Sequence, residues 1–143
     1  MAELTLAKAR AIVEGALAHA RAQKFQPLAV AVLDARGVLK AFAAEDGTSL
    51  RRSDIAIGKA HGAVAMGTGS RALAKAATER PHFVAAVSHV VGGSLVPVPG
   101  GVLIRDDEGT LLGAAGISGD TSDHDEAAAL AGIKQAGFAG EPG

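Results

Sequence analysis

The feature that most constrains the fold is a pair of tight turns with the same spelling, Asp-x-x-Gly, at residues 34–37 and 106–109. Glycine closes such turns because it adopts the left-handed conformation without steric cost. Each turn joins two short apolar runs, and these runs occupy residues 28–33, 38–44, 101–105 and 110–118. The pattern predicts two antiparallel hairpins. A further apolar run at residues 94–98 predicts an additional strand, which would extend the second hairpin into a three-stranded meander.

Four other segments carry the helical spacing of apolar residues, and they occupy residues 5–23, 53–66, 70–78 and 122–135. Thr5 is expected to cap the first helix, and Pro81 is expected to stop the third. Residues 82–93 fit either a short helix or a packed loop. The tail beyond Gly137 is rich in glycine and proline, so we expect it to be frayed.

This order of elements predicts an α+β fold in which helices flank a central antiparallel sheet of about five strands. The chain has 143 residues, of which 48% are hydrophobic. That length suits one hydrophobic core, so residues 1–143 are expected to form a single domain.

Charge and cysteine content exclude several classes of protein. The 14 basic and 15 acidic residues give a net charge of -1 without long runs of either sign, so we expect no nucleic-acid partner. The absence of cysteine excludes disulfides, thiolate metal sites and a cysteine nucleophile. The first residues lack the order of a signal peptide, and no apolar stretch is long enough to cross a bilayer. These features predict a cytoplasmic protein without a membrane partner.

Small side chains dominate the sequence. It contains 19 glycines but only four phenylalanines, and neither tryptophan nor tyrosine. Such residues let backbones approach closely but bury little apolar area each. A core of this kind is thin for an isolated domain, so we expect burial against further copies of the chain in a homo-oligomer.

The stretch from Gly113 to Glu126 combines a strand of small residues with a polar turn and an acidic helix start. Capping by Thr121 or Ser122 and a favourable helix dipole explain the acidic residues most simply. The alternative is a ligand or metal loop that uses Asp120, Asp123 and His124. Gly116 and Gly119 in the same stretch predict a close approach by a substrate or a partner backbone.

None of the five histidines has the spacing of a helical zinc site. His19 and His61 each fall between the apolar and polar faces of a predicted helix, which makes them the best candidates to line a pocket. Lys59 precedes His61 by two residues, and its ammonium is expected either to hold a ligand carboxylate or to reach solvent. Gly58 and Gly62 would let another surface approach this edge.

Serine-hydrolase and nucleotide-binding motifs are absent. No Gly-x-Ser-x-Gly occurs, and Ser118 lies in Gly-Ile-Ser-Gly instead. The Gly-Gly pairs at residues 92–93 and 100–101 lack the lysine of a phosphate-binding loop.

An ordered set of segments resembles the GlcG/HbpS family of haem-binding-like proteins, which is related to the C-terminal domain of some cobalamin adenosyltransferase proteins. The set spans nearly the whole chain: VAVLDARGVL at 30–39, SDIAIGKA at 53–60, SRALA at 70–74, PVPGGVLI at 97–104, GAAGISG at 113–119 and DHDE at 123–126. The resemblance implies a profilin-like α+β fold and homo-oligomers from dimers up to octamers. It also implies that some members bind haem or a related cofactor, with a first-helix histidine as iron ligand. His19 falls in that place.

Three hypotheses for function follow. The first is a small-molecule binding protein, with haem as the candidate cofactor, whose pocket near a subunit interface uses His19, Ser118, Asp120 and His124. The second is an isomerase, lyase or hydratase of a carboxylated metabolite, with Lys59 as anchor and His61 as general base. The third is a structural subunit whose glycines serve packing alone.

Overall fold

The fold is built on a five-stranded antiparallel sheet, seen in the computed structural model, which describes residues 3–143. The strands in spatial order are β2 (Leu39–Ala44), β1 (Ala29–Asp34), β4 (Leu111–Ser118), β3 (Gly101–Arg105) and β5 (Ala139–Glu141). The two expected hairpins, β1–β2 and β3–β4, are confirmed, and β1 pairs with β4 to join them. The α+β fold with helices flanking a sheet is therefore confirmed.

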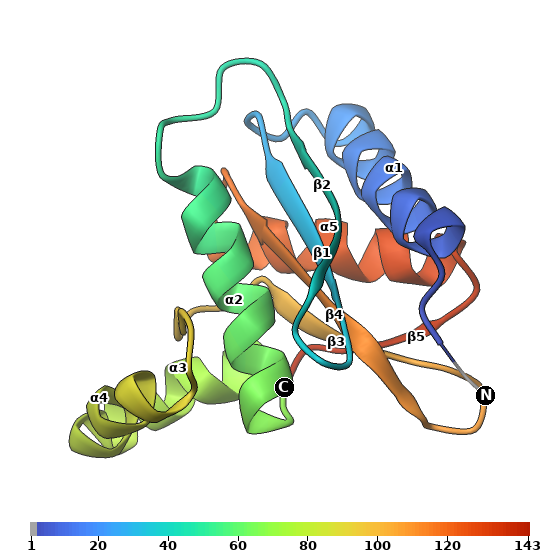
Figure 1. Cartoon of the computed structure of the whole chain (residues 1–143). Coiled ribbons are helices and arrows are strands. Elements are labelled where there is room, and N and C mark those ends of the chain that lie inside the picture. The colour runs from blue at the N-terminus through green and yellow to red at the C-terminus, as the bar shows by residue number, and fades with distance from the viewer. Residues whose placement is uncertain (1–2) are drawn as a thin grey trace.

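Helices cover both faces of this sheet (Figure 1). One face carries α1 (Leu6–Ala22) and α5 (Ser122–Gln135), which pack on each other as well as on the strands. The opposite face carries α2 (Arg52–Met66). Strand residues alternate between the two layers, because Val30 belongs to the α1–α5 core whereas Ala31 packs toward α2.

The N-cap predicted at Thr5 is present, and of the two candidates for the last helix, Thr121 and Ser122, Thr121 is the N-cap. The Thr5 hydroxyl accepts a hydrogen bond from the Lys8 amide, and the Thr121 hydroxyl accepts one from the His124 amide. A polar side chain thus satisfies one of the unpaired amides at each helix start.

Glycines allow the layers to approach at backbone contact distance. A Cβ at Gly116 of β4 would collide with the carbonyl oxygen of Ala56 in α2. A Cβ at Gly132 of α5 would likewise collide with the carbonyl oxygen of Ile12 in α1. The close approach expected at Gly116 is therefore made by this chain's own helix.

Most of residues 82–93, for which the sequence allows either a short helix or a packed loop, is helical. It forms α4 (Pro81–Val90), which follows α3 (Ser70–Glu79) almost directly and packs mainly against it. Proline suits the first turn of a helix, because an amide there has no partner inside the helix. Pro81 accordingly ends one helix and begins the next.

Residues 94–98 form no strand, which corrects the three-stranded meander. This segment lies on α2 instead, where a Cβ at Gly58 would meet Val96 and Ser94, and a Cβ at Gly62 would meet Leu95. The Val96 amide donates to the Gly58 carbonyl at 3.1 Å. The surface expected to approach Gly58 and Gly62 is thus supplied by the chain itself.

The fifth strand comes from the tail that was expected to fray. β5 pairs antiparallel with β3, and its Glu141 forms an ion pair with Arg105. The Arg71 amide also donates to the Pro142 carbonyl, which ties the tail to the start of α3. No helix among residues 3–143 has the length and apolar character needed to cross a membrane.

Candidate functional site

Three connections converge at one end of the sheet: α1–β1, β2–α2 and β4–α5. The α1–β1 connection begins with Lys24, whose φ of 59° is left-handed and unusual for a residue with a side chain. The Phe25 amide donates back to the Ala20 carbonyl at 2.9 Å, which closes the end of α1. This turn holds Phe25 beside the helix it follows.

Phe25 is the centre of a cluster of rings. The His19 ring of α1 meets it edge to face, with a centroid distance of 5.8 Å and an interplanar angle of 72°. The His124 ring of α5 stacks on it at 4.3 Å and 7°. Two predicted site residues that are distant in sequence are therefore brought to one place by an aromatic ring.

Asp120 fixes the orientation of His124. Its carboxylate lies 2.7 Å from Nδ1 of His124 and also accepts hydrogen bonds from the amides of Gln26 and Thr121. The amide of Gln26, then that of Thr121, and then His124 hold the pKa of Asp120 below its usual value against the opposing effect of burial. An ionised carboxylate is only an acceptor, so Nδ1 of His124 carries the proton. In neutral His124 this leaves Nε2 with its lone pair, as a base or a ligand requires.

His19 is half-buried, and its ring forms no hydrogen bond with any group of residues 3–143. Both of its nitrogens therefore keep their capacity to bind a metal centre or a ligand. No cluster of three or more histidine, aspartate and glutamate side chains in this part of the chain could hold a bare metal ion.

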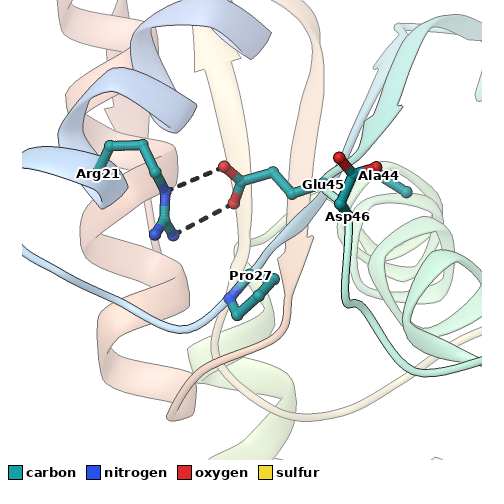
Figure 2. A pocket seen from close by; sticks show the side chains of 5 residues that line it. All are labelled: Arg21, Pro27, Ala44, Glu45 and Asp46. Carbon is teal, nitrogen blue, oxygen red and sulfur yellow. Dashed lines mark hydrogen bonds and ion pairs between the residues drawn. The ribbon is translucent and has the colours of Figure 1, made fainter.

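A polar cavity of about 480 Å³ lies beside the cluster, between Arg21, Pro27 and residues 44–46 (Figure 2). Arg21 and Glu45 reach toward one another in it, with the Arg21 Nε atom 3.0 Å from a Glu45 carboxylate oxygen. Arg21 also donates to the carbonyls of Phe25 and Gln26, and Glu45 accepts from the Leu28 amide at 2.8 Å. Both charges are therefore compensated within the chain.

Lys59 lies in the interior and reaches neither solvent nor a surface cavity. Its side chain is 2% exposed, and its ammonium donates to the Ile117 carbonyl at 2.8 Å and to the Asp125 carboxylate at 3.1 Å. Burial lowers the pKa of Lys59 and raises that of Asp125, although each charge partly offsets the shift of the other. Asp125 in turn accepts from the Asp120 amide, so the pair braces the loop that carries Asp120.

His61 lies elsewhere. Its Nδ1 is 2.8 Å from the Ser94 carbonyl oxygen, and its ring lies against Gly37 and Gly93. Gly37 belongs to the turn that ends β1, whereas Phe25 precedes the start of that strand. The structure therefore places His61 and the His19–His124 cluster at opposite ends of the sheet, and Lys59 and His61 point to different surroundings.

Ser118 is fully buried at the end of β4, where its hydroxyl accepts a hydrogen bond from Arg52 at 3.2 Å. The neighbouring Gly119 packs against the Pro27 carbonyl. The close approach expected at Gly119 is thus made by the α1–β1 connection.

Sequence reasoning missed Phe25 and Arg52. Phe25 could have been suspected as one of only four aromatic residues, placed directly after the first predicted helix. Arg52 carried no such signal, because arginine at a helix start is ordinary surface chemistry.

Comparison with solved structures finds the same fold in several proteins. The structure described as a PduOC:heme complex is 25% identical, with a TM-score of 0.84 over 96% of this chain and 97% of that one. A double mutant of HbpS from Streptomyces reticuli is 26% identical, with a TM-score of 0.80 over 94% and 87%. Protein ORFY of Klebsiella pneumoniae is 20% identical, with a TM-score of 0.83 over 95% and 92%, and this likeness concerns the fold alone.

No curated protein sequence matches the chain significantly. A family model does match, over residues 4–134, and its description is haem degrading protein HbpS-like. Because this match covers most of the chain, and the sequence segments, the fold and the solved structures agree with it, the chain belongs to the HbpS-like family that this model describes.

Proposed function

We propose that this protein binds haem, or a closely related planar cofactor, with His19 as the iron ligand. The observation that carries the proposal is the half-buried His19 ring, which has no hydrogen-bond partner among residues 3–143 and lies against Phe25. An imidazole of this kind is the commonest axial ligand of haem iron. The family match and the haem complex of PduOC support the same cofactor.

The residues of one chain fit part of a haem site. They offer an imidazole and an aromatic ring, but His19 does not line the cavity of Figure 2, and the chain has only four phenylalanines to cover a porphyrin. Haem supplies its own four equatorial nitrogens, so one histidine is enough to hold the iron. We infer that a second copy of the chain covers the other face of the cofactor, so that the site lies at a subunit edge of a homo-oligomer.

Haem titration tests the proposal. Hemin added to the purified protein should shift the Soret band, and His19→Ala should weaken binding by at least about tenfold and change the spectrum. His61→Ala is the matched control, since this histidine lies at the other end of the sheet. Identical spectra and affinities for wild type and His19→Ala would remove His19 as the ligand.

Catalysis on a carboxylated metabolite is a second candidate, favoured by the Asp120–His124 pair rather than by Lys59 and His61. A carboxylate that holds the Nδ1 proton of an imidazole leaves Nε2 to act as a general base. His124 has this arrangement, with its side chain 51% exposed. If a substrate is found, His124→Gln should abolish turnover while His61→Gln leaves it unchanged.

A further inference from the structure

A second, smaller cavity lies next to the cluster, and it has a different chemistry. It measures about 180 Å³ and is lined by Gln26, Thr48, Ser49, Arg52 and Gly119, among others. Pro27 forms a wall of both this cavity and that of Figure 2. The volume lies below the ~300 Å³ at which typical ligand pockets begin, so it suits a small group rather than a whole cofactor.

Among residues 3–143, Arg52 is the only charged side chain that lines this cavity. Its one side-chain hydrogen bond within residues 3–143 goes to the Ser118 hydroxyl, and it forms no ion pair with a carboxylate of that range. A guanidinium has several N–H donors in a planar fork, so most of them remain without a partner. Arg21, Arg36, Arg51, Arg71 and Arg105 each pair with a carboxylate. Arg10 and Arg80 also form no ion pair within residues 3–143, but neither of them lines this cavity.

The neighbouring groups favour a negative ligand. The hydroxyls of Thr48 and Ser49 form no side-chain hydrogen bonds with residues 3–143 and can donate to an oxygen. The positive end of the α2 dipole lies at the same place, because α2 begins at Arg52. The Asp120 carboxylate, which accepts from the amides of Gln26 and Thr121 and lies 2.7 Å from Nδ1 of His124, forms no ion pair with Arg52.

The geometry points to a carboxylate-binding site in this cavity, with Arg52 as the anchor and Thr48 and Ser49 as hydrogen-bond donors. Planar carboxylates match the fork of a guanidinium, and the bonds are charge-assisted. The site takes the role of carboxylate anchor that the sequence suggests for Lys59, whose buried ammonium is instead engaged by the Ile117 carbonyl and the Asp125 carboxylate.

The carboxylate could belong to a free organic acid or to a propionate of a porphyrin whose ring lies outside the cavity. Only the second source rests on the proposed haem function. The two are separated by measuring acetate and pyruvate binding by calorimetry without haem, and by comparing hemin with hemin dimethyl ester, which lacks the free carboxylates.

Arg52→Gln is the diagnostic variant and Arg51→Gln is its matched control, because Arg51 pairs with Asp54 and does not line the cavity. We expect Arg52→Gln to weaken binding of the carboxylate probe by about 10- to 100-fold, as expected for loss of a charge-assisted contact. Thr48→Val should weaken it less. Arg52→Lys, which keeps the charge, should lie between wild type and Arg52→Gln and shows whether the fold tolerates a change at this position.

For a free acid, wild type binds acetate or pyruvate and Arg52→Gln does not. For a propionate, wild type prefers hemin to its dimethyl ester, and Arg52→Gln loses that preference while the Soret band from His19 remains. The site is excluded if wild type binds neither acid and does not distinguish hemin from its ester. It is equally excluded if Arg51→Gln reproduces the effect of Arg52→Gln.

Discussion

The Lys59 ammonium lies 3.1 Å from the Asp125 carboxylate in the interior, where the two side chains are 2% and 1% exposed. The contact joins α2 to α5 across the end of β4, because Lys59 also donates to the Ile117 carbonyl. It also supports the candidate site, since Asp125 accepts from the Asp120 amide and Asp120 orients His124. A buried ion pair thus connects the two helical layers at the end of the sheet that carries the ring cluster.

Removing one partner of this pair should be strongly destabilising. Lys59→Met leaves the Asp125 carboxylate buried without its counter-ion, and we expect a loss of about 3–5 kcal/mol in the free energy of unfolding. The double variant Lys59→Met, Asp125→Leu should recover most of that loss, because no charge is then buried alone. Urea denaturation measures the free energy of unfolding of both variants.

Lys75→Met is the control for lysine removal, since Lys75 and Glu79 are exposed and 4.0 Å apart. It should leave stability nearly unchanged. A Lys59→Met protein as stable as the Lys75→Met protein would contradict the interior pair.

Asp120 should make stability depend on pH in the acid range. Its pKa in the folded protein lies below the ordinary 3.8, chiefly because the amides of Gln26 and Thr121 and the His124 side chain bond the carboxylate. The unfolded chain therefore takes up this proton first as pH falls. The stabilisation is fully present above pH 3.8 and is lost as pH falls through the lower folded value.

Asp120→Asn should lower the free energy of unfolding by about 1 kcal/mol or more at neutral pH, because the charge-assisted hydrogen bonds are weakened. Its stability should approach that of wild type toward about pH 2, as measured by urea titrations at a series of pH values. Asp123→Asn is the control, since the Asp123 side chain is 78% exposed and its replacement removes only a surface ion pair with Arg71, which keeps its pair with Glu126. A constant gap between Asp120→Asn and wild type at every pH would refute this assignment.

Gly132→Ala should separate the helices of the α1–α5 layer. The new methyl group would collide with the Ile12 carbonyl and the Ala16 amide, which are backbone groups that cannot rotate away. We expect a loss of about 1–3 kcal/mol in the free energy of unfolding, despite the better helix propensity of alanine. Gly67→Asn is the control, because Gly67 ends α2 in a left-handed conformation with no atom within 4 Å of its missing Cβ. In thermal denaturation, Tm should fall clearly for Gly132→Ala and only slightly for Gly67→Asn.

Local features of the fold were predictable from the sequence. The two Asp-x-x-Gly turns specify the hairpins, and the helical spacing with Thr5 and Thr121 as caps specifies α1 and α5. These signals involve residues a few positions apart, so the energetics are decided within the segment. Residues 94–98 were misassigned because an apolar run fits a strand as well as a covering loop, and only the surface of α2 distinguishes the two.

The candidate site was predictable only in part. His19, Asp120 and His124 were identified from the sequence, and the structure brings them to one end of the sheet together with Phe25. His61 was grouped with His19 because both histidines lie between the apolar and polar faces of a helix. Spacing along one helix does not reveal which end of the sheet a residue reaches.

By itself the sequence determined the two hairpins, the four helices with clear periodicity, the α+β class and the family, because turn chemistry, helix periodicity and an ordered set of segments are local properties of the chain. Only the tertiary structure decided which side chains meet. Lys59 and Asp125 are 66 positions apart, and their contact depends on how closely α2 and α5 approach the sheet. That approach is set by glycines whose missing side chains leave no signal until the opposing backbone is in place. Arg52 could not be recognised from the sequence either, because its lack of an ion-pair partner within residues 3–143 is a property of the packed molecule and not of the residues beside it in sequence.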